Sequence, residues 1–180
     1  MFKKNIFFSI LILVFILCTA FNDKKPKILI VGDSISIGYT PFVKKHFLNN
    51  AVVLHNIGNA QHTGTGLLKI EEWLGDAHWD IIQFNWGLWD LCYRHPDSKE
   101  YGNRDKINGK PEYSITEYAS NLESLVSMIK HNITVNDIYL ESVDIHNIYG
   151  KGLKDVHYSP EGYKKLSELI IKFLETDIKL

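Results

Sequence analysis

One short segment combines the residue type and the position that a nucleophile needs. A buried strand is predicted to end, and a helix to begin, at Gly32-Asp33-Ser34-Ile35-Ser36. A serine at such a junction presents its hydroxyl at the ligand-binding edge of a sheet, and its backbone N–H lies near a helix N-terminus, where the field favours developing negative charge. The structural alternative is that Ser34 or Ser36 only caps the helix, a common role for serine.

A serine nucleophile needs a base, and one histidine near the C-terminus is suitably placed. The last predicted helix is preceded by Asp155-Val156-His157-Tyr158. We expect His157 to accept the proton of Ser34, while Asp155 holds the imidazole in the correct tautomer and stabilises the imidazolium. Asp155 also has a simpler alternative role, because an acidic residue near a helix N-terminus is stabilising by itself. The other seven histidines are better interpreted as surface or core residues.

Three apolar segments rich in β-branched residues are predicted as strands buried on both faces. They span residues 27–32, 51–57 and 79–85, and helices are predicted between them over about 36–48 and 65–74. Alternating strands and helices predict βαβ units, a parallel sheet and helices on both faces, with ligands beyond the carboxyl ends of the strands. The predicted fold class is therefore α/β with three layers.

The second half of the chain begins with a polar, turn-rich stretch over 87–113, which we interpret as a long surface loop at the carboxyl end of the third strand. Ordered loops of this length are uncommon and tend to be functional. A Ser-x-x-Glu capping box at 114–117 starts the next helix. A last strand is predicted over 137–143, and Ser159 followed by proline starts the final helix.

The N-terminus has the pattern of a secretory signal. Two lysines precede an apolar run over 6–17, and small residues follow it. An uncleaved membrane anchor is the alternative, although the run is shorter than the roughly 20 residues of a spanning helix. A lipid anchor on Cys18 is a third option. The predicted organisation is a signal peptide at 1–20, a linker at 21–26 and one domain at 27–180, in an exported protein.

Composition excludes several classes of protein. The 180 residues are 45% hydrophobic and 23% charged, which is ordinary globular composition. Two cysteines cannot make a disulfide scaffold, and they are not spaced as Cys-x-x-Cys. The net charge of -1 gives no basic field to attract nucleic acid or an anionic membrane. We expect no nucleic-acid partner and, after signal cleavage, no stable membrane partner.

The motifs, in this order, resemble the SGNH (GDSL) hydrolase superfamily. Gly-Asp-Ser follows the first strand, an Asn/Gly-rich turn the second and Gly-x-x-Asp the third, while Asp and His precede the last helix. The resemblance covers residues 21–180 and implies a flavodoxin-like, three-layer α/β/α esterase or lipase with a Ser-His-Asp triad and no metal or cofactor. Ser34 then matches the nucleophile and His157 the base.

The resemblance also implies an oxyanion hole. Besides the backbone N–H of Ser34, the second motif offers Gly58 or the backbone N–H of Gln61. The third motif of the family is Gly-x-Asn-Asp, whose Asn donates to the oxyanion, but Trp89 stands at that position here. Asn85 is the candidate substitute, and the loss of one such donor typically costs about 100- to 1,000-fold in turnover.

Two further features depart from the family pattern. Its acid usually lies three residues before the histidine, where this chain has Lys154, whereas Asp155 lies two before. The family also leads us to expect another strand and helix before the last strand, but only residues 131–137 are present there. The sheet is therefore predicted to be short by one strand and one helix. The chain is then either a compact natural variant or a shortened one in which His157 is misplaced relative to Ser34.

Aromatic and polar residues near the expected cleft are candidates for substrate contacts. Trp73 and Trp79 fit core positions, whereas Trp86 and Trp89 either line the cleft or pack in the core, because aromatic residues serve both roles. Charged residues of the 87–113 loop either orient a polar substrate or are simply solvated. The residues predicted to contact substrate are Asp33, Trp86, Trp89 and Arg94.

The expected activity is that of an exported serine esterase that removes acetyl or another short acyl group from a carbohydrate through an acyl-Ser34 intermediate. A lipase or lysophospholipase type of acylhydrolase is one alternative, because sequence gives no pocket volume. The other is a secreted glycan-binding protein that keeps the fold without catalysis. The tryptophan at position 89, the lysine at 154 and the short middle segment motivate this second hypothesis.

Overall fold

The three strands form a parallel sheet in the order β2-β1-β3. A computed structural model describes residues 24–98, 103–129 and 138–178. The central strand β1 (Lys27–Val31) pairs with β2 (Val52–His55) on one side and with β3 (Ile81–Phe84) on the other. These strands confirm the segments predicted at 27–32, 51–57 and 79–85. The central position of β1 explains its continuous apolar sequence, because residues on both of its faces are buried.

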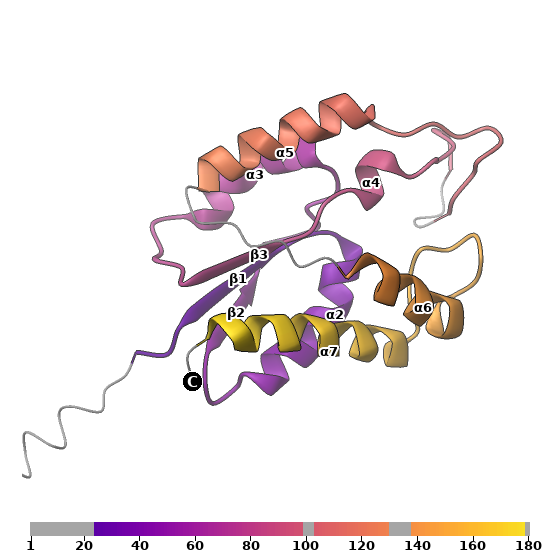
Figure 1. The fold of residues 1–180 in the computed structure, drawn as a ribbon. Helices are drawn as coiled ribbons and strands as arrows, with labels where there is room; N and C mark the ends of the chain where they lie inside the picture. The colour runs from indigo at the N-terminus through magenta and orange to yellow at the C-terminus, as the bar shows by residue number, and fades with distance from the viewer. Residues whose placement is uncertain (1–23, 99–102, 130–137, 179–180) are drawn as a thin grey trace, which may run out of the picture.

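Helices cover both faces of the sheet, as Figure 1 shows. One face packs against α2 (Ser34–His46) and α7 (Pro160–Asp177), and the other against α3 (Thr63–Leu74) and α5 (Ile115–Ile129). Alternate residues of β1 enter the two cores: Ile28 and Ile30 belong to the first, Leu29 and Val31 to the second. The three-layer α/β/α class predicted from the sequence is confirmed.

The two helix starts read from capping patterns are confirmed. Glu117 accepts hydrogen bonds from the backbone and the hydroxyl of Ser114 at 2.8 and 2.7 Å, and the Ser114 hydroxyl accepts from the Glu117 N–H at 3.2 Å. Ser159 caps α7 by accepting from the Gly162 N–H, with a proline at the first helical position. These local bonds fix where α5 and α7 begin.

The strand predicted over 137–143 is wrong, because the described part of this segment enters a helix, α6 (Tyr139–Tyr149). The seven residues of this predicted segment were too few to show the helical period of its apolar residues. Over its full length, Ile138, Ser142, Ile145 and Tyr149 recur at helical spacing. Ile138 and Ile145 pack against the first core, and Figure 1 shows α6 beside α7. Among the described residues the sheet therefore has three strands, with β3 at its edge.

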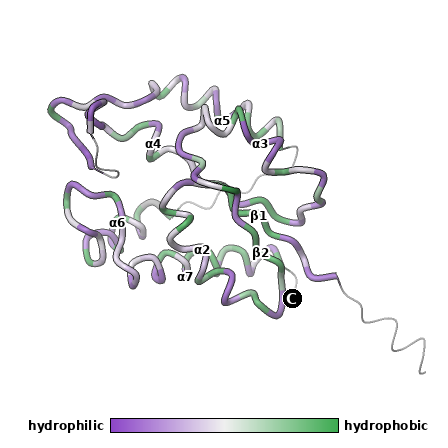
Figure 2. Tube along the Cα trace, turned by 180° about the vertical axis from the view of Figure 1, so that it is seen from behind, coloured by the Kyte–Doolittle hydropathy of each residue, from purple (hydrophilic) through white to green (hydrophobic). Residues whose placement is uncertain are grey.

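The stretch after β3 contains more structure than a plain loop. A short helix, α4 (Leu88–Leu91), opens it, and an antiparallel bridge between Arg94 and Lys110 folds the described part of the loop back on itself. Figure 2 shows apolar residues concentrated in β1 and β2, while the loop beyond α4 is mainly polar. The loop is thus anchored near the sheet edge where ligands bind in this class of fold.

Some predictions fall outside the described residues. These are the signal peptide, residues 21–23 of the linker, and the segment over 131–137 where a strand and helix were expected to be missing. Within the parts that are described, no helix is long and apolar enough to cross a membrane.

Candidate active site

Ser34 is the first residue of α2, directly after the buried turn that ends β1. The N-cap of this helix is Asp33, whose carboxylate accepts from the Ile35 N–H at 2.9 Å. The alternative in which Ser34 or Ser36 caps the helix is therefore wrong. Because Asp33 is the cap, the Ser34 hydroxyl is available for chemistry. Gly32 leaves room at the turn for its neighbours, because a Cβ there would clash with the Asn85 side chain and the Ser36 hydroxyl and displace them.

His157 completes a hydrogen-bonded chain with Ser34 and Asp155. Its Nε2 lies 2.9 Å from Oγ of Ser34, a residue 123 positions away in sequence. Its Nδ1 lies 2.8 Å from Oδ1 of Asp155. Because the carboxylate can only accept, Nδ1 carries the proton and Nε2 accepts from the Ser34 hydroxyl. This is the geometry of a nucleophile, a base and an orienting acid.

Asp155 reaches the histidine although it lies only two residues before it. Its Oδ1 also accepts the backbone N–H of His157 at 2.9 Å, so one carboxylate oxygen holds both the main chain and the ring. Burial by itself raises the pKa of Asp155, but the two hydrogen bonds from His157 and the electrostatic attraction of His157 and Lys151 outweigh it and hold the pKa below its usual value. Lys154 is exposed and takes no part in this chain.

Two of the four candidate oxyanion donors, the Gln61 N–H and the Asn85 amide, have other partners in this structure. Gly58 is exposed with φ +76°. The Gln61 N–H donates to Oδ1 of Asn59 at 2.9 Å, and its φ of +47° is a conformation that non-glycine residues rarely adopt. The Asn85 amide donates to Asp33 at 3.4 Å. The oxyanion hole of Ser34, Gly58, Gln61 and Asn85 therefore stays a prediction.

A small cleft of about 20 Å³ opens beside the nucleophile. Two of the predicted substrate residues line it: Trp89 and Arg94, whose guanidinium carbon lies 4.4 Å from the centre of the Trp89 ring. Ser34 and His157 were also predicted as site residues, whereas Leu88, Cys92 and Val156 were not, because nothing in their local pattern distinguishes them from core residues. The full lining is Ser34, Leu88, Trp89, Cys92, Arg94, Val156 and His157.

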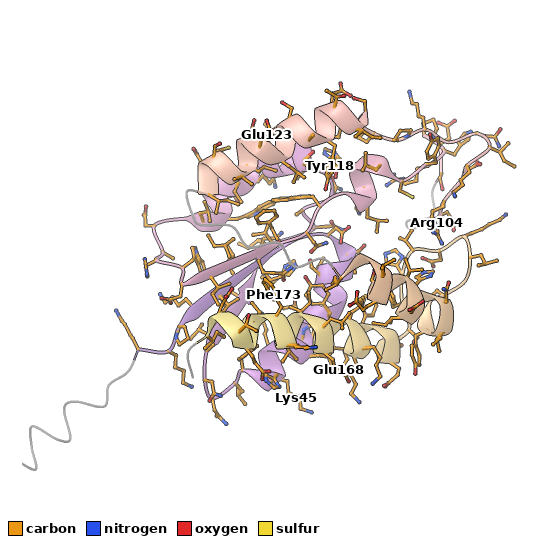
Figure 3. All side chains as sticks on the ribbon, viewed as in Figure 1. Lys45, Arg104, Tyr118, Glu123, Glu168 and Phe173 are labelled. Atoms are coloured by element: carbon orange, nitrogen blue, oxygen red, sulfur yellow. The ribbon has the colours of Figure 1, made fainter. Side chains whose placement is uncertain are left out.

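The remaining predicted substrate residues, Asp33 and Trp86, are not part of this small cleft, although both border a larger cavity beside β3. Asp33 is buried beneath the turn, with 1% of its surface exposed. Trp86 packs against the second core and its indole donates to the Ala60 carbonyl at 3.4 Å. Its own carbonyl accepts from Tyr118 of α5 at 3.1 Å, a residue labelled in Figure 3. Trp73 and Trp79 are in the core, as predicted.

Asp90, the acid of the Gly-x-x-Asp segment, joins the loops around the cleft. It is fully buried, and its Oδ1 accepts the N–H of Thr63 at 2.8 Å as well as the Thr63 hydroxyl. Its Oδ2 accepts the N–H of Gly87 at 3.1 Å. The start of α3 and the end of β3 are thereby fixed to one carboxylate.

A second serine–histidine pair lies deeper in the molecule. Oγ of Ser36 lies 2.7 Å from Nε2 of His55, whose Nδ1 donates to the Asn56 carbonyl at 2.8 Å. Burial lowers the pKa of His55, which keeps the ring neutral. Because Ser36 has no exposed surface, this pair holds the turn below Ser34 and is closed to substrate. No feature of the sequence indicated this contact.

One comparison with known proteins bears on this site. The chain is 25% identical over 168 residues to a protein named arylesterase from Vibrio mimicus, an alignment that covers 87% of this chain and 73% of that protein. No family model matches the chain. The similarity to an esterase supports ester hydrolysis as the general activity, which agrees with the chemistry of the triad geometry.

Proposed function

We propose that this protein is a serine esterase that hydrolyses its substrate through an acyl-Ser34 intermediate. The observation that carries the proposal is the hydrogen-bonded chain from Asp155 through His157 to Ser34, with links of 2.8 and 2.9 Å. Ser34 lies 123 positions from His157 in the sequence, so the alignment of the serine with the His157–Asp155 pair is not a consequence of local sequence.

The proposed reaction has two stages. Oγ of Ser34 attacks the ester carbonyl carbon as its proton passes to Nε2 of His157, and the tetrahedral intermediate expels the alcohol, which takes that proton. Water then attacks the acyl-serine, giving its proton to Nε2. Collapse of the second intermediate releases the carboxylic acid and returns the proton to Ser34. Asp155 stabilises the imidazolium formed in both stages.

We also propose that the protein is an exported member of the SGNH (GDSL) type. The nucleophile directly after β1, the histidine just before α7 and the three-layer fold support this assignment. Export rests on the lysines and the apolar run before residue 18. The two departures in the motifs, Trp89 and Lys154, affect the oxyanion donor and the spacing of the acid.

For the substrate, we propose an acyl group carried by a carbohydrate. The cleft beside Ser34 has room by itself for only a small group such as acetyl. The Trp89 ring beside the Arg94 guanidinium offers an apolar face and hydrogen-bond donors, a combination that suits a sugar hydroxyl and ring. A glycan or small-molecule ester is therefore the proposed partner.

The test is covalent labelling with a fluorophosphonate, followed by intact-mass spectrometry and peptide mapping. An activated Ser34 displaces fluoride and gains one phosphonyl group. Ser34→Ala abolishes the adduct, and His157→Ala reduces both labelling and aryl-acetate turnover by about 1,000-fold, because the base is lost.

Matched controls keep this test specific. Ser124→Ala and His78→Ala change exposed residues of the same types and leave labelling unchanged. Circular dichroism confirms that each variant is folded. A folded wild-type chain that gains no adduct and turns over no aryl ester contradicts the esterase proposal and favours the glycan-binding alternative.

A further inference from the structure

A cavity of about 720 Å³ lies beside β3 in the described structure. This volume is within the range of small-molecule binding sites, and its walls are predominantly apolar. The apolar residues of these walls come from α2, α6 and α7 and from Ile138, the residue before α6. The apolar side chains that define it are Ile35, Tyr39, Ile138, Val143, Leu166 and Ile170.

The cavity follows from the topology of the sheet. Within the described residues β3 is an edge strand, and Gln83 and Asn85 at its carboxyl end line the cavity. The segment predicted as a further strand is instead α6, which packs beside α7. A further strand paired with β3 would lie about 4.8 Å from it and fill the space beside it. Because α6 packs beside α7 instead, that space remains open.

The cavity adjoins the proposed catalytic cleft. Leu88 and Val156 line both hollows. Asp33, the residue before Ser34 in the sequence, also borders the cavity. A chain attached to Oγ of Ser34 therefore starts beside two apolar side chains that also form part of the wall of the larger space.

Two of the polar side chains at the cavity are bonded to backbone carbonyls of the connection between α6 and α7. His146 lies 2.8 Å from the Asp155 carbonyl, and Arg104 donates to the Leu153 carbonyl at 2.6 Å. Figure 3 labels Arg104, which reaches toward the connection between α6 and α7. Burial raises the pKa of Asp33, which favours its neutral form next to an apolar occupant. The cavity therefore presents mainly carbon to whatever enters it.

We propose that this cavity binds the acyl chain of the ester, and that the enzyme accepts medium-length acyl groups of roughly six to ten carbons. The proposal rests on the proposed esterase function. The acyl carbonyl lies at Ser34, the chain passes between Leu88 and Val156, and the alcohol leaves on the side of Trp89 and Arg94. Acetyl esters remain substrates, since the small cleft holds the reacting group by itself.

The test compares kcat/KM for p-nitrophenyl esters from acetate to decanoate, which share one leaving group. Burial of each methylene contributes roughly a threefold to fourfold gain when it is complete. We expect octanoate to exceed acetate by about tenfold to a hundredfold, since the burial of the chain is incomplete.

A cavity-filling variant separates this binding from the chemistry. Val143→Trp places an indole in the cavity, and we expect it to remove at least about tenfold of the octanoate advantage while acetate turnover stays within about twofold. Leu140→Trp is the matched control, because Leu140 is on the same helix, 74% exposed, and not part of the lining. If Val143→Trp fails to fold, Leu153→Trp replaces it, since Leu153 lines the cavity but is 92% exposed.

The two proposals fail in different ways. A flat chain-length profile, or an octanoate preference that survives Val143→Trp, overturns the acyl cavity while acetate turnover upholds the esterase. Loss of both turnover and the phosphonate adduct overturns the esterase. In that case octanoic acid binding to Ser34→Ala, measured by displacement of a fluorescent apolar dye, decides the cavity: binding that Val143→Trp abolishes supports it, and no displacement overturns it.

Discussion

At the scale of single residues, the hydrogen bonds of the Asp155 carboxylate determine which residue is the acid of the proposed triad. Asp155 accepts from both the backbone N–H and Nδ1 of His157, and its own carbonyl lies 2.8 Å from Nε2 of His146. These contacts bring an acid two positions before the histidine to the ring nitrogen. Lys154, three positions before the histidine, is exposed and takes no part in this arrangement.

Replacing Asp155 by asparagine tests this assignment. Asp155→Asn keeps the shape but can stabilise the wrong histidine tautomer, so kcat for an aryl acetate is expected to fall by about 100- to 10,000-fold. The measurement is steady-state kinetics on folded protein. Lys154→Ala is the neighbouring control and keeps wild-type kcat; an equal loss in both variants would show that the loop, rather than the carboxylate, matters.

At the scale of elements, Asp90 links segments that no local pattern connects. It receives hydrogen bonds from Thr63 at the start of α3 and from Gly87 at the end of β3, and Asn121 of α5 donates to the Thr63 hydroxyl at 3.0 Å. Three elements therefore meet at one buried carboxylate. The loop that carries Trp89 and Arg94 begins at this junction, so its position depends on the junction.

Asp90→Asn is expected to weaken both the fold and the site. The amide nitrogen cannot accept a hydrogen bond, so one buried donor loses its partner at a cost of about 2 kcal/mol in the free energy of unfolding. Urea denaturation measures this loss, and kcat/KM for an aryl ester falls with it. Asp97→Asn, at a side chain 91% exposed in the same loop, leaves both quantities unchanged. Equal stability of the two variants would refute the role of Asp90.

At the scale of the whole molecule, the proposed active site lies at the carboxyl ends of the strands, where the two hydrophobic cores meet. The turn after β1 is buried between them, and Asp33 in it has 1% of its surface exposed. Burial raises the pKa of Asp33, although hydrogen bonds from Ile35 and Asn85 oppose that rise. Position in the fold therefore disfavours the charged form of this carboxylate.

The pH dependence of stability follows from this shift. The unfolded chain releases the Asp33 proton near the usual pKa of 3.8, whereas the folded chain holds it to higher pH. The stabilising contribution is thus complete below 3.8 and is lost as pH rises through the folded pKa. We expect Asp33→Asn to gain stability relative to wild type over this interval, by about 1.4 kcal/mol for each unit by which the fold raises the pKa.

Denaturant unfolding at a series of pH values from about 3.5 to 7.5 measures this difference, and the comparison of two chains cancels the other titrating groups. Asp76→Asn changes an exposed carboxylate and serves as the control. A difference between wild type and Asp33→Asn that stays constant with pH would contradict the prediction.

The sequence by itself predicted the α/β class, three of the four proposed strands, and the helix starts at Ser114 and Ser159. These succeed because hydrophobic period and capping residues act within a few positions of one another. It also proposed Ser34 and His157, from their places at the ends of predicted elements. The geometry that joins them depends on the sheet, which sets residues far apart in sequence side by side.

Only the tertiary structure decided the remaining features. It placed Asp155 against the His157 ring, made Asp33 the cap of α2, and formed a helix where a strand was predicted at 137–143. The reason in each case is packing at long range. A short apolar segment has similar intrinsic preference for strand and helix, and contact with α7 and the first core, rather than a place beside β3, determined its form and left the adjoining cavity.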